Sequence, residues 1–167
     1  MTIQESGIIF GDYDENDVYP IEKSKKYSEI KSKGVSSVEF VLHWKNKKIM
    51  FVEAKNSAPN PNNPDSEQRF EEFLQEINIK FEDSFEIFER VWLEREIGGI
   101  FDRIEVQSCE IIFLLVINGF NKEWLVPIKE GLEQILKEHR TLCLLWHPKV
   151  LVINEQQAAS KGLVISE

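Results

Sequence analysis

Three charged residues interrupt two apolar runs that follow each other in the chain. The segment VEFVLHWKNKKIMFVEAKNS, residues 38–57, has Glu39 in its first run and Glu53 and Lys55 in its second. Two carboxylates that meet in a poorly solvated place raise each other's pKa, and a divalent cation held between them removes that cost. A lysine beside such a cation can orient a water molecule or stabilise charge on a phosphoryl oxygen. These residue types therefore indicate metal-assisted chemistry on a phosphate ester.

A simpler interpretation stays open on these residues alone. Glu39 and Glu53 can bind Lys55 or neighbouring lysines in an ordinary cross-strand cluster of ion pairs. Oxygen ligands, in contrast, suit Mg²⁺ or Mn²⁺, which keep several waters and take further ligands from a substrate phosphate. The cofactor expected from the catalytic interpretation is therefore Mg²⁺ or Mn²⁺.

Two strands must position the three charges. The runs at 35–44 and 48–55 are rich in β-branched and aromatic residues and are joined by KNKK, which predicts an antiparallel pair. Side chains alternate between the faces of a strand, so Glu53 and Lys55 share one face. The placement of Glu39 depends on the pairing register.

The turn between the strands sets that register. Facing residues in an antiparallel pair have numbers with a constant sum, and an even sum of 92 or 94 brings Glu39 opposite Glu53 or Lys55. A three-residue loop with Asn46 or Lys47 in a left-handed conformation gives 92, whereas a two-residue Asn46-Lys47 turn gives an odd sum and the opposite face. The sequence leaves both registers open, and we expect the even one.

The pattern of an acid, a hairpin and then (D/E)-x-K on the next strand resembles the active-site signature of the PD-(D/E)XK nuclease superfamily, which includes many restriction endonucleases and Holliday-junction resolvases. Glu39 is followed 14 positions later by Glu53-Ala54-Lys55. The resemblance covers roughly residues 20–118. It departs from the family where Val38-Glu39 stands in place of the common Pro-Asp, and where only two strands, not three, are clear before the end of the motif.

The resemblance implies a role for each matching residue. The catalytic residues would be Lys55, Glu53 and Glu39. The metal ligands would be Glu39, Glu53 and the backbone carbonyl of Ala54, with Glu22 assisting from the leading helix and Glu29 as the second choice there.

Basic residues gather around the same segment. The chain has a net charge of −9, but residues 21–55 carry +5. Lysines that border a cleft can hold phosphates in register, although lysines of this kind also serve simply to solubilise a helix and a turn. The lysines expected to rim the site and bind nucleic acid are Lys23, Lys25, Lys26, Lys45, Lys47 and Lys48.

The other elements predict one α/β domain over residues 1–167. A helix of about three turns is expected from Pro20 to Gly34, and a long amphipathic helix over 66–97, with a kink or break near 82–84 and an end at Gly98-Gly99. CEIIFLLVIN predicts a buried central strand, WLVPIKEGLEQILKEHR a second amphipathic helix, and TLCLLWHP with KVLVIN one or two further strands. The expected fold is a mixed central sheet with helices on both faces, with a restriction-endonuclease-like core.

The positions of the cysteines and the lengths of the apolar runs indicate the cellular compartment of the protein. Cys109 and Cys143 each lie in an apolar run, which is typical of reduced core thiols. The N-terminus has no basic region followed by an apolar one, and no apolar run is long enough to cross a bilayer. We therefore expect a cytoplasmic protein without a membrane partner.

The function expected from these observations is metal-dependent hydrolysis of phosphodiester bonds, in DNA rather than RNA. The competing hypothesis is a catalytically inactive domain that keeps the nuclease fold as a binding or regulatory module. The acidic remainder of the chain, −14 outside residues 21–55, motivates it, because that charge repels a long nucleic acid. Nucleic acid is the expected partner, and a homodimer is left open as the assembly.

Overall fold

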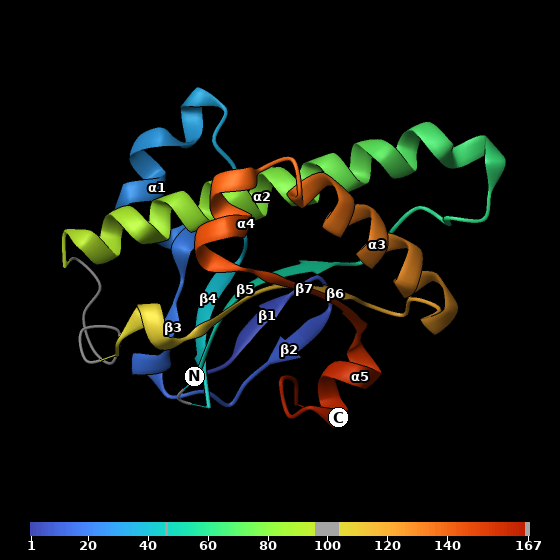
Figure 1. Ribbon diagram of the computed structural model, residues 1–167. Helices are drawn as coiled ribbons and strands as arrows, with labels where there is room; N and C mark the ends of the chain where they lie inside the picture. The colour runs from blue at the N-terminus through green and yellow to red at the C-terminus, as the bar shows by residue number, and fades with distance from the viewer. Residues whose placement is uncertain (46, 96–103, 166–167) are drawn as a thin grey trace.

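A computed structural model describes residues 1–45, 47–95 and 104–165 of the chain. They form an α/β fold around a mixed five-stranded sheet, with a separate two-stranded hairpin (Figure 1). The sheet strands are β3 (Val18–Tyr19), β4 (Phe40–Trp44), β5 (Lys48–Lys55), β6 (Glu110–Ile117) and β7 (Lys149–Asn154). The α/β class and the mixed sheet are as the sequence predicted.

The strands lie in the order β3-β4-β5-β6-β7. The pairs β3–β4 and β4–β5 are antiparallel, whereas β5–β6 and β6–β7 are parallel. Strand β6 lies between β5 and β7 and is apolar from Ile111 to Ile117, because both of its faces are covered. The two-residue strand β3 precedes β4 and β5 in this sheet. It is the third motif strand, which the sequence did not show clearly.

Helices cover one face of the sheet and mainly a hairpin covers the other. The helices α2, α3 and α4 pack on the face of Val41, Phe51 and Phe113, and the short helix α5 lies on the opposite side with the hairpin (Figure 1). The helices are α1 (Lys25–Ile30), α2 (Glu67–Leu93), α3 (Leu125–Leu136), α4 (Arg140–Trp146) and α5 (Glu155–Ser160). Both faces therefore carry helix, but very unequally.

The hairpin β1 (Ile3–Glu5) and β2 (Ile8–Phe10) turns tightly at Ser6-Gly7. Both turn residues have positive φ, 51° and 74°, as a two-residue turn that matches strand twist requires. Ile8 and Phe10 are buried against the even-numbered face of β4 and β5. This packing brings Glu5, the last residue of β1, towards the end of the sheet.

The β4–β5 register has the even sum that was expected. Phe40 faces Val52 and Trp44 faces Lys48, so the connecting loop has three residues. Among the described residues of this loop, Lys45 has the left-handed conformation, with φ of 50°. That conformation was expected at Asn46 or Lys47. Asn46 lies outside the described residues.

Three predicted elements differ in the structure. The expected three-turn helix after Pro20 is a 3-10 turn, η2 (Ile21–Lys23), then α1 and a second 3-10 turn, η3 (Lys31–Lys33). The first predicted strand starts at Phe40 rather than at residue 35. Helix α2 runs unbroken through 82–84 and ends at Leu93, and Gly98-Gly99 lie outside the described residues.

TLCLLWHP and KVLVIN were expected to supply one or two further strands. KVLVIN forms one, β7, whereas TLCLLW lies within helix α4, so a strand at TLCLLW is wrong. A short apolar run fits either a strand or a helix, and its spacing does not distinguish them. In the helix, Leu142 is buried and Trp146, one turn later, packs against Phe85, while Leu144 and Leu145 are exposed.

No helix within the described ranges is long and apolar enough to span a membrane.

Helix α2 holds the segment that leads into β4. The Val38 N–H donates to Ser84 Oγ at 2.8 Å, and the Ser36 N–H donates to Asp83 Oδ2 at 2.8 Å. Val38 and Ser84 are both completely buried. These two hydrogen bonds therefore fix the chain next to Glu39 against the helix.

We expect Ser84→Ala to lower the free energy of unfolding by about 1–3 kcal/mol, because it leaves the buried Val38 N–H without its acceptor. Urea denaturation measures the change. Ser28→Ala is the control, since Ser28 is exposed on α1 and its hydroxyl bonds only to a carbonyl of its own helix. Equal effects of the two substitutions would contradict the role given to Ser84.

Candidate metal centre

Three carboxylates from separate parts of the chain converge at the end of the sheet where β4 begins and β5 ends. Glu5 comes from β1, Glu22 from the turn η2 and Glu39 from the residue before β4, and one ligand oxygen of each lies within 4.8 Å of the others. Glu22 is exposed, whereas Glu5 and Glu39 are partly buried. Two of the predicted ligands, Glu22 and Glu39, are thus brought together with Glu5, whereas the predicted ligand Glu53 is not part of this group.

Glu39 reaches this place through an irregular piece of chain. Its N–H donates to the Val52 carbonyl at 3.1 Å, one position short of the partner, Glu53, that the register alone would give. Val38 and Val41 both belong to the apolar cluster beneath α2. In a regular strand, side chains three residues apart point to opposite faces of the sheet, so the chain between these two residues is irregular. The convergence therefore depends on this irregularity, not only on the strand alternation that was predicted.

Glu53 is completely buried and is neutralised from two sides. Its Oε1 lies 2.6 Å from Lys80 Nζ of α2 and 3.5 Å from Lys55 Nζ. Lys55 Nζ also donates to Glu76, one helical turn before Lys80, at 2.7 Å. Glu53 and Lys55 are therefore neighbours, as predicted, within an ion-pair network that α2 completes.

The second carboxylate oxygen of Glu53 is unusual. Glu53 Oε2 is buried and has no hydrogen-bond partner among the described residues. A buried carboxylate oxygen without a partner is costly, and a bound cation or water would satisfy it. Glu53 is also close enough to Glu39 to raise the pKa of the Glu39 carboxyl.

The pKa values of the site show how strongly its charges oppose one another. Burial, and then the nearby carboxylates of Glu53, Glu5 and Glu22, raise the pKa of Glu39 to about 8 from its usual 4.5. Burial also raises the pKa of Glu53, against the opposing effect of Lys80 and Lys55. Without a cation, the excess of carboxylates over lysines is unfavourable at this point.

The Glu53–Lys80 pair affects the lysine as well. Burial by itself lowers the pKa of Lys80, but the carboxylates of Glu53, Glu39 and Glu76 raise it above its ordinary value. The Lys80 ammonium therefore stays charged beside Glu53. It is the one charge that α2 places in contact with Glu53 directly.

The β1–β2 turn is tied to the ends of β5 and β6. Ser6 Oγ donates to the Ala54 carbonyl at 3.0 Å, and Asn118 Nδ2 donates to the Ser6 carbonyl at 3.1 Å. The Ala54 carbonyl, a predicted metal ligand, thus already accepts a hydrogen bond from a side chain. Its second lone pair remains for a cation.

The other predicted site residues are distributed around the fold. Glu29 lies on α1 outside the group of converging carboxylates. Lys23 and Lys25 are exposed on η2 and at the start of α1, within three residues of Glu22. Lys26 Nζ is paired with Glu94 of the α2 C-terminus at 2.8 Å.

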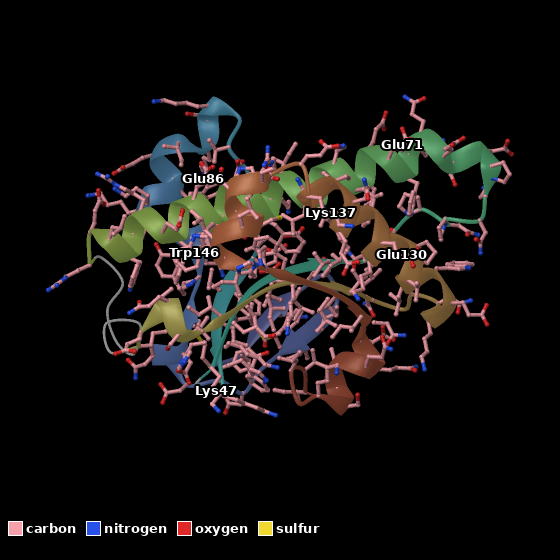
Figure 2. All side chains as sticks on the ribbon, viewed as in Figure 1. Lys47, Glu71, Glu86, Glu130, Lys137 and Trp146 are labelled. Atoms are coloured by element: carbon pink, nitrogen blue, oxygen red, sulfur yellow. The ribbon has the colours of Figure 1, made fainter. Side chains whose placement is uncertain are left out.

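The remaining three lysines, Lys45, Lys47 and Lys48, lie at the β4–β5 loop. Lys48 and Lys55 are seven positions apart on β5, which corresponds to about 23 Å. Figure 2 shows Lys47 at the end of the strand pair that is far from α1. The prediction that these three lysines border the carboxylates is therefore wrong, because a hairpin loop lies at the opposite end from the start of its first strand.

Two members of the site were not found from the sequence. Glu5 precedes Ser6-Gly7, a short turn signal between apolar triplets, but nothing in the sequence shows that this hairpin folds against the motif strands. Lys80 is one of several charged residues in the 67–93 helix. Only its position one turn after Glu76 and one turn before Ser84, on the stripe that faces the sheet, distinguishes it.

The arrangement fits a hard divalent cation. Glu5, Glu22 and Glu39 offer carboxylate oxygens at one point, Glu53 adds an unsatisfied oxygen nearby, and such ligands suit Mg²⁺ or Mn²⁺. Comparison of the chain with protein-family models, curated proteins and solved structures found no match. The function of the protein is therefore inferred from the geometry of this site.

We expect Glu39 to make stability fall as pH rises. Between its ordinary pKa of 4.5 and its folded value of about 8, the folded chain holds a proton that the unfolded chain has released, so the free energy of unfolding decreases through this window. In Glu39→Gln that contribution is absent. Because Glu39 is partly exposed, the loss between about pH 5 and pH 8.5 should be smaller in the variant by roughly 2 kcal/mol.

Urea denaturation at both pH values, without divalent metal, measures this difference. Glu29→Gln is the matched control, because it removes the same charge from an exposed position outside the group. A Glu39→Gln variant with the same pH dependence as wild type would contradict the mutual repulsion inferred for the site.

Proposed function

We propose that the protein is a divalent-metal-dependent phosphodiesterase that hydrolyses nucleic acid, DNA in preference to RNA, in the manner of a PD-(D/E)XK nuclease. The observation that carries the proposal is the convergence of Glu5, Glu22 and Glu39 beside the buried Glu53 with its unsatisfied oxygen. Carboxylates gathered in a partly buried place repel one another, and either a proton on Glu39 or a bound cation relieves that repulsion. A cation held by carboxylates is a common means of activating phosphate esters.

The residues have distinct roles in this proposal. Glu39, Glu22 and Glu5 would hold Mg²⁺ or Mn²⁺, with Glu53 Oε2 as a fourth ligand. The bound ion would polarise the phosphoryl group and lower the pKa of an attacking water. Lys55, whose Nζ lies 3.5 Å from Glu53 Oε1, would orient that water or stabilise charge on a phosphoryl oxygen.

Lys80 takes a positioning role. Its 2.6 Å bond to Glu53 Oε1 fixes the carboxylate so that Oε2 remains available for the ion. Lys80 also offsets part of the negative charge before the metal binds. It thereby keeps a carboxylate in a place where burial favours the neutral acid.

The surroundings favour a short region of contact with substrate. Lys23 and Lys25 lie next to Glu22 and can meet phosphates near the metal. The net charge of −9 repels a long stretch of nucleic acid. We therefore expect binding of a few phosphates close to the site, with cleavage near an end, a branch or a single-stranded segment.

The second candidate function is a catalytically inactive binding or regulatory module with the same site. One observation favours it: Lys55 Nζ lies closer to Glu76, at 2.7 Å, than to Glu53. Because Lys55 is held by the exposed Glu76, it is less available to a substrate phosphate. The two candidates differ in whether metal binds and whether Lys55 supports turnover.

Metal binding should stabilise the protein. At a concentration about one hundred times the dissociation constant, Mn²⁺ is expected to add about 2.7 kcal/mol to the free energy of unfolding, which raises the melting temperature by roughly 5–10 °C. Glu39→Gln should lose most of this increase. Differential scanning fluorimetry with Mn²⁺ and Mg²⁺ measures it.

Glu29→Gln is again the matched control and should keep the full increase. An equal Mn²⁺ effect on Glu39→Gln and Glu29→Gln would show that the ion binds elsewhere. No shift at millimolar metal, together with no salt-sensitive DNA binding, would favour the inactive module.

Cleavage should require Glu53 and Lys55. With labelled single-stranded, duplex and branched DNA and Mn²⁺ or Mg²⁺, Glu53→Gln and Lys55→Gln are each expected to lower the cleavage rate at least about 100-fold, because each removes a group that acts on the reacting phosphate. Lys33→Gln, an exposed lysine of η3, should cleave like wild type. Gel assays of initial rate report the comparison.

Folding must be checked for these variants, since Glu53→Gln leaves Lys80 without its carboxylate. Circular dichroism and a melting curve serve that purpose. Activity that survives in folded Glu53→Gln and Lys55→Gln would exclude both residues from the mechanism. Metal binding without any cleavage in wild type would support the inactive module instead.

A further inference from the structure

A second concave site lies at the other end of the sheet. A cavity of about 620 Å³ opens where β5, β6 and β7 begin, next to the end of α3. Its charged lining consists of Lys48, Lys129, Lys137, Lys149, Glu110 and Glu133. Four lysines around one cavity stand out in a chain whose net charge is −9.

The ion pairs in this cavity leave positive charge uncompensated. Glu110 is shared between Lys149 and Lys48, whose Nζ lies 3.8 Å from Glu110 Oε2. One carboxylate between two ammonium groups leaves one net positive charge. The pairing with Lys149, and then with Lys48, lowers the pKa of Glu110. Its carboxylate therefore stays ionised and is already bound to these two lysines.

Helix α3 supplies the second uncompensated charge. Lys129, Glu133 and Lys137 follow one another at steps of four, so they form one stripe along the helix. Lys129 pairs with Glu133 at 3.4 Å, whereas Lys137 has no ion pair within the described residues. Lys137 lies at the end of α3 nearest α4 (Figure 2). The cavity thus presents two positive charges in excess of its carboxylates.

The remaining lining is apolar. Ile112, Leu136, Pro148, Val150 and Leu151 contribute to the wall. Val150 packs under the helices, whereas Leu151 packs with the opposite face of the sheet, so the cavity extends over the exposed edge of β7. A volume near 620 Å³ lies within the range of small-molecule sites, which combine apolar walls with a few polar groups.

We propose that this cavity binds a phosphate monoester with an apolar or aromatic body. Two excess ammonium charges match the dianion of a phosphate monoester at neutral pH. The apolar wall over β7 would receive the body of the ligand, and Lys137 and Lys149 would contact its phosphate. The site is separate from the carboxylates, since Lys48 and Glu53 are five residues apart on β5, about 17 Å.

Isothermal titration calorimetry with naphthyl phosphate tests the proposal on the full chain, at about pH 7.5 and without added divalent metal. Wild type should bind naphthyl phosphate in a saturable, one-to-one manner and at least about tenfold more tightly than inorganic phosphate. Naphthol, which lacks the phosphate, should bind at least as weakly as inorganic phosphate. Because no metal is present, the result is independent of the proposed phosphodiesterase activity.

Lys137→Gln and Lys149→Gln should each weaken binding of naphthyl phosphate at least fivefold. Both lysines are exposed, so neither substitution should unfold the chain, which a melting curve verifies. Lys161→Gln is the matched control, because Lys161 is exposed after α5 and is not part of the cavity. Binding that is absent in wild type, or equal in all three variants, would overturn the proposal. Equal affinity for inorganic phosphate and naphthyl phosphate would also overturn it, because the apolar wall would then contribute nothing.

Discussion

The buried ion pair between Glu53 and Lys80 is the interaction on which the arrangement of the site depends. Glu53 has no exposed surface, and the 2.6 Å contact with Lys80 joins the end of β5 to the middle of α2. Removing one partner of such a pair leaves a buried charge and costs about 3–5 kcal/mol, whereas the intact pair is close to neutral for stability. The pair is therefore better explained by a role in positioning the carboxylate than by a gain in stability.

The rest of the site is arranged around that fixed carboxylate. Ser84 and Asp83, on the same helix, hold the backbone that precedes Glu39, while the Ser6 hydroxyl ties the β1–β2 turn to β5. Three elements that are distant in sequence thus bring carboxylates to one point. Natural proteins carry strained or costly features mainly at functional sites, and repulsion among these carboxylates is a cost of that kind.

The two ends of the sheet carry opposite charge. Carboxylates gather where β5 ends, and lysines gather where β5, β6 and β7 begin. The chain sum of −9 hides this separation. A metal ion at one end and a phosphorylated ligand at the other would each be attracted to its own end, because screening confines such interactions to about 10 Å.

The sequence by itself determined the α/β class, the strand pair and the place of Glu53 and Lys55 on one strand face, because side-chain alternation acts over a few residues. It left two registers open for the strand pair, and the position of Glu39 depends on the even register and on the irregular chain before β4. Only the tertiary structure decided that α4 is a helix and that Glu5 and Lys80 belong to the site. It also placed Lys45, Lys47 and Lys48 away from the carboxylates. Those outcomes depend on how distant segments pack, and local spacing carries no record of which face of a helix or hairpin meets the sheet.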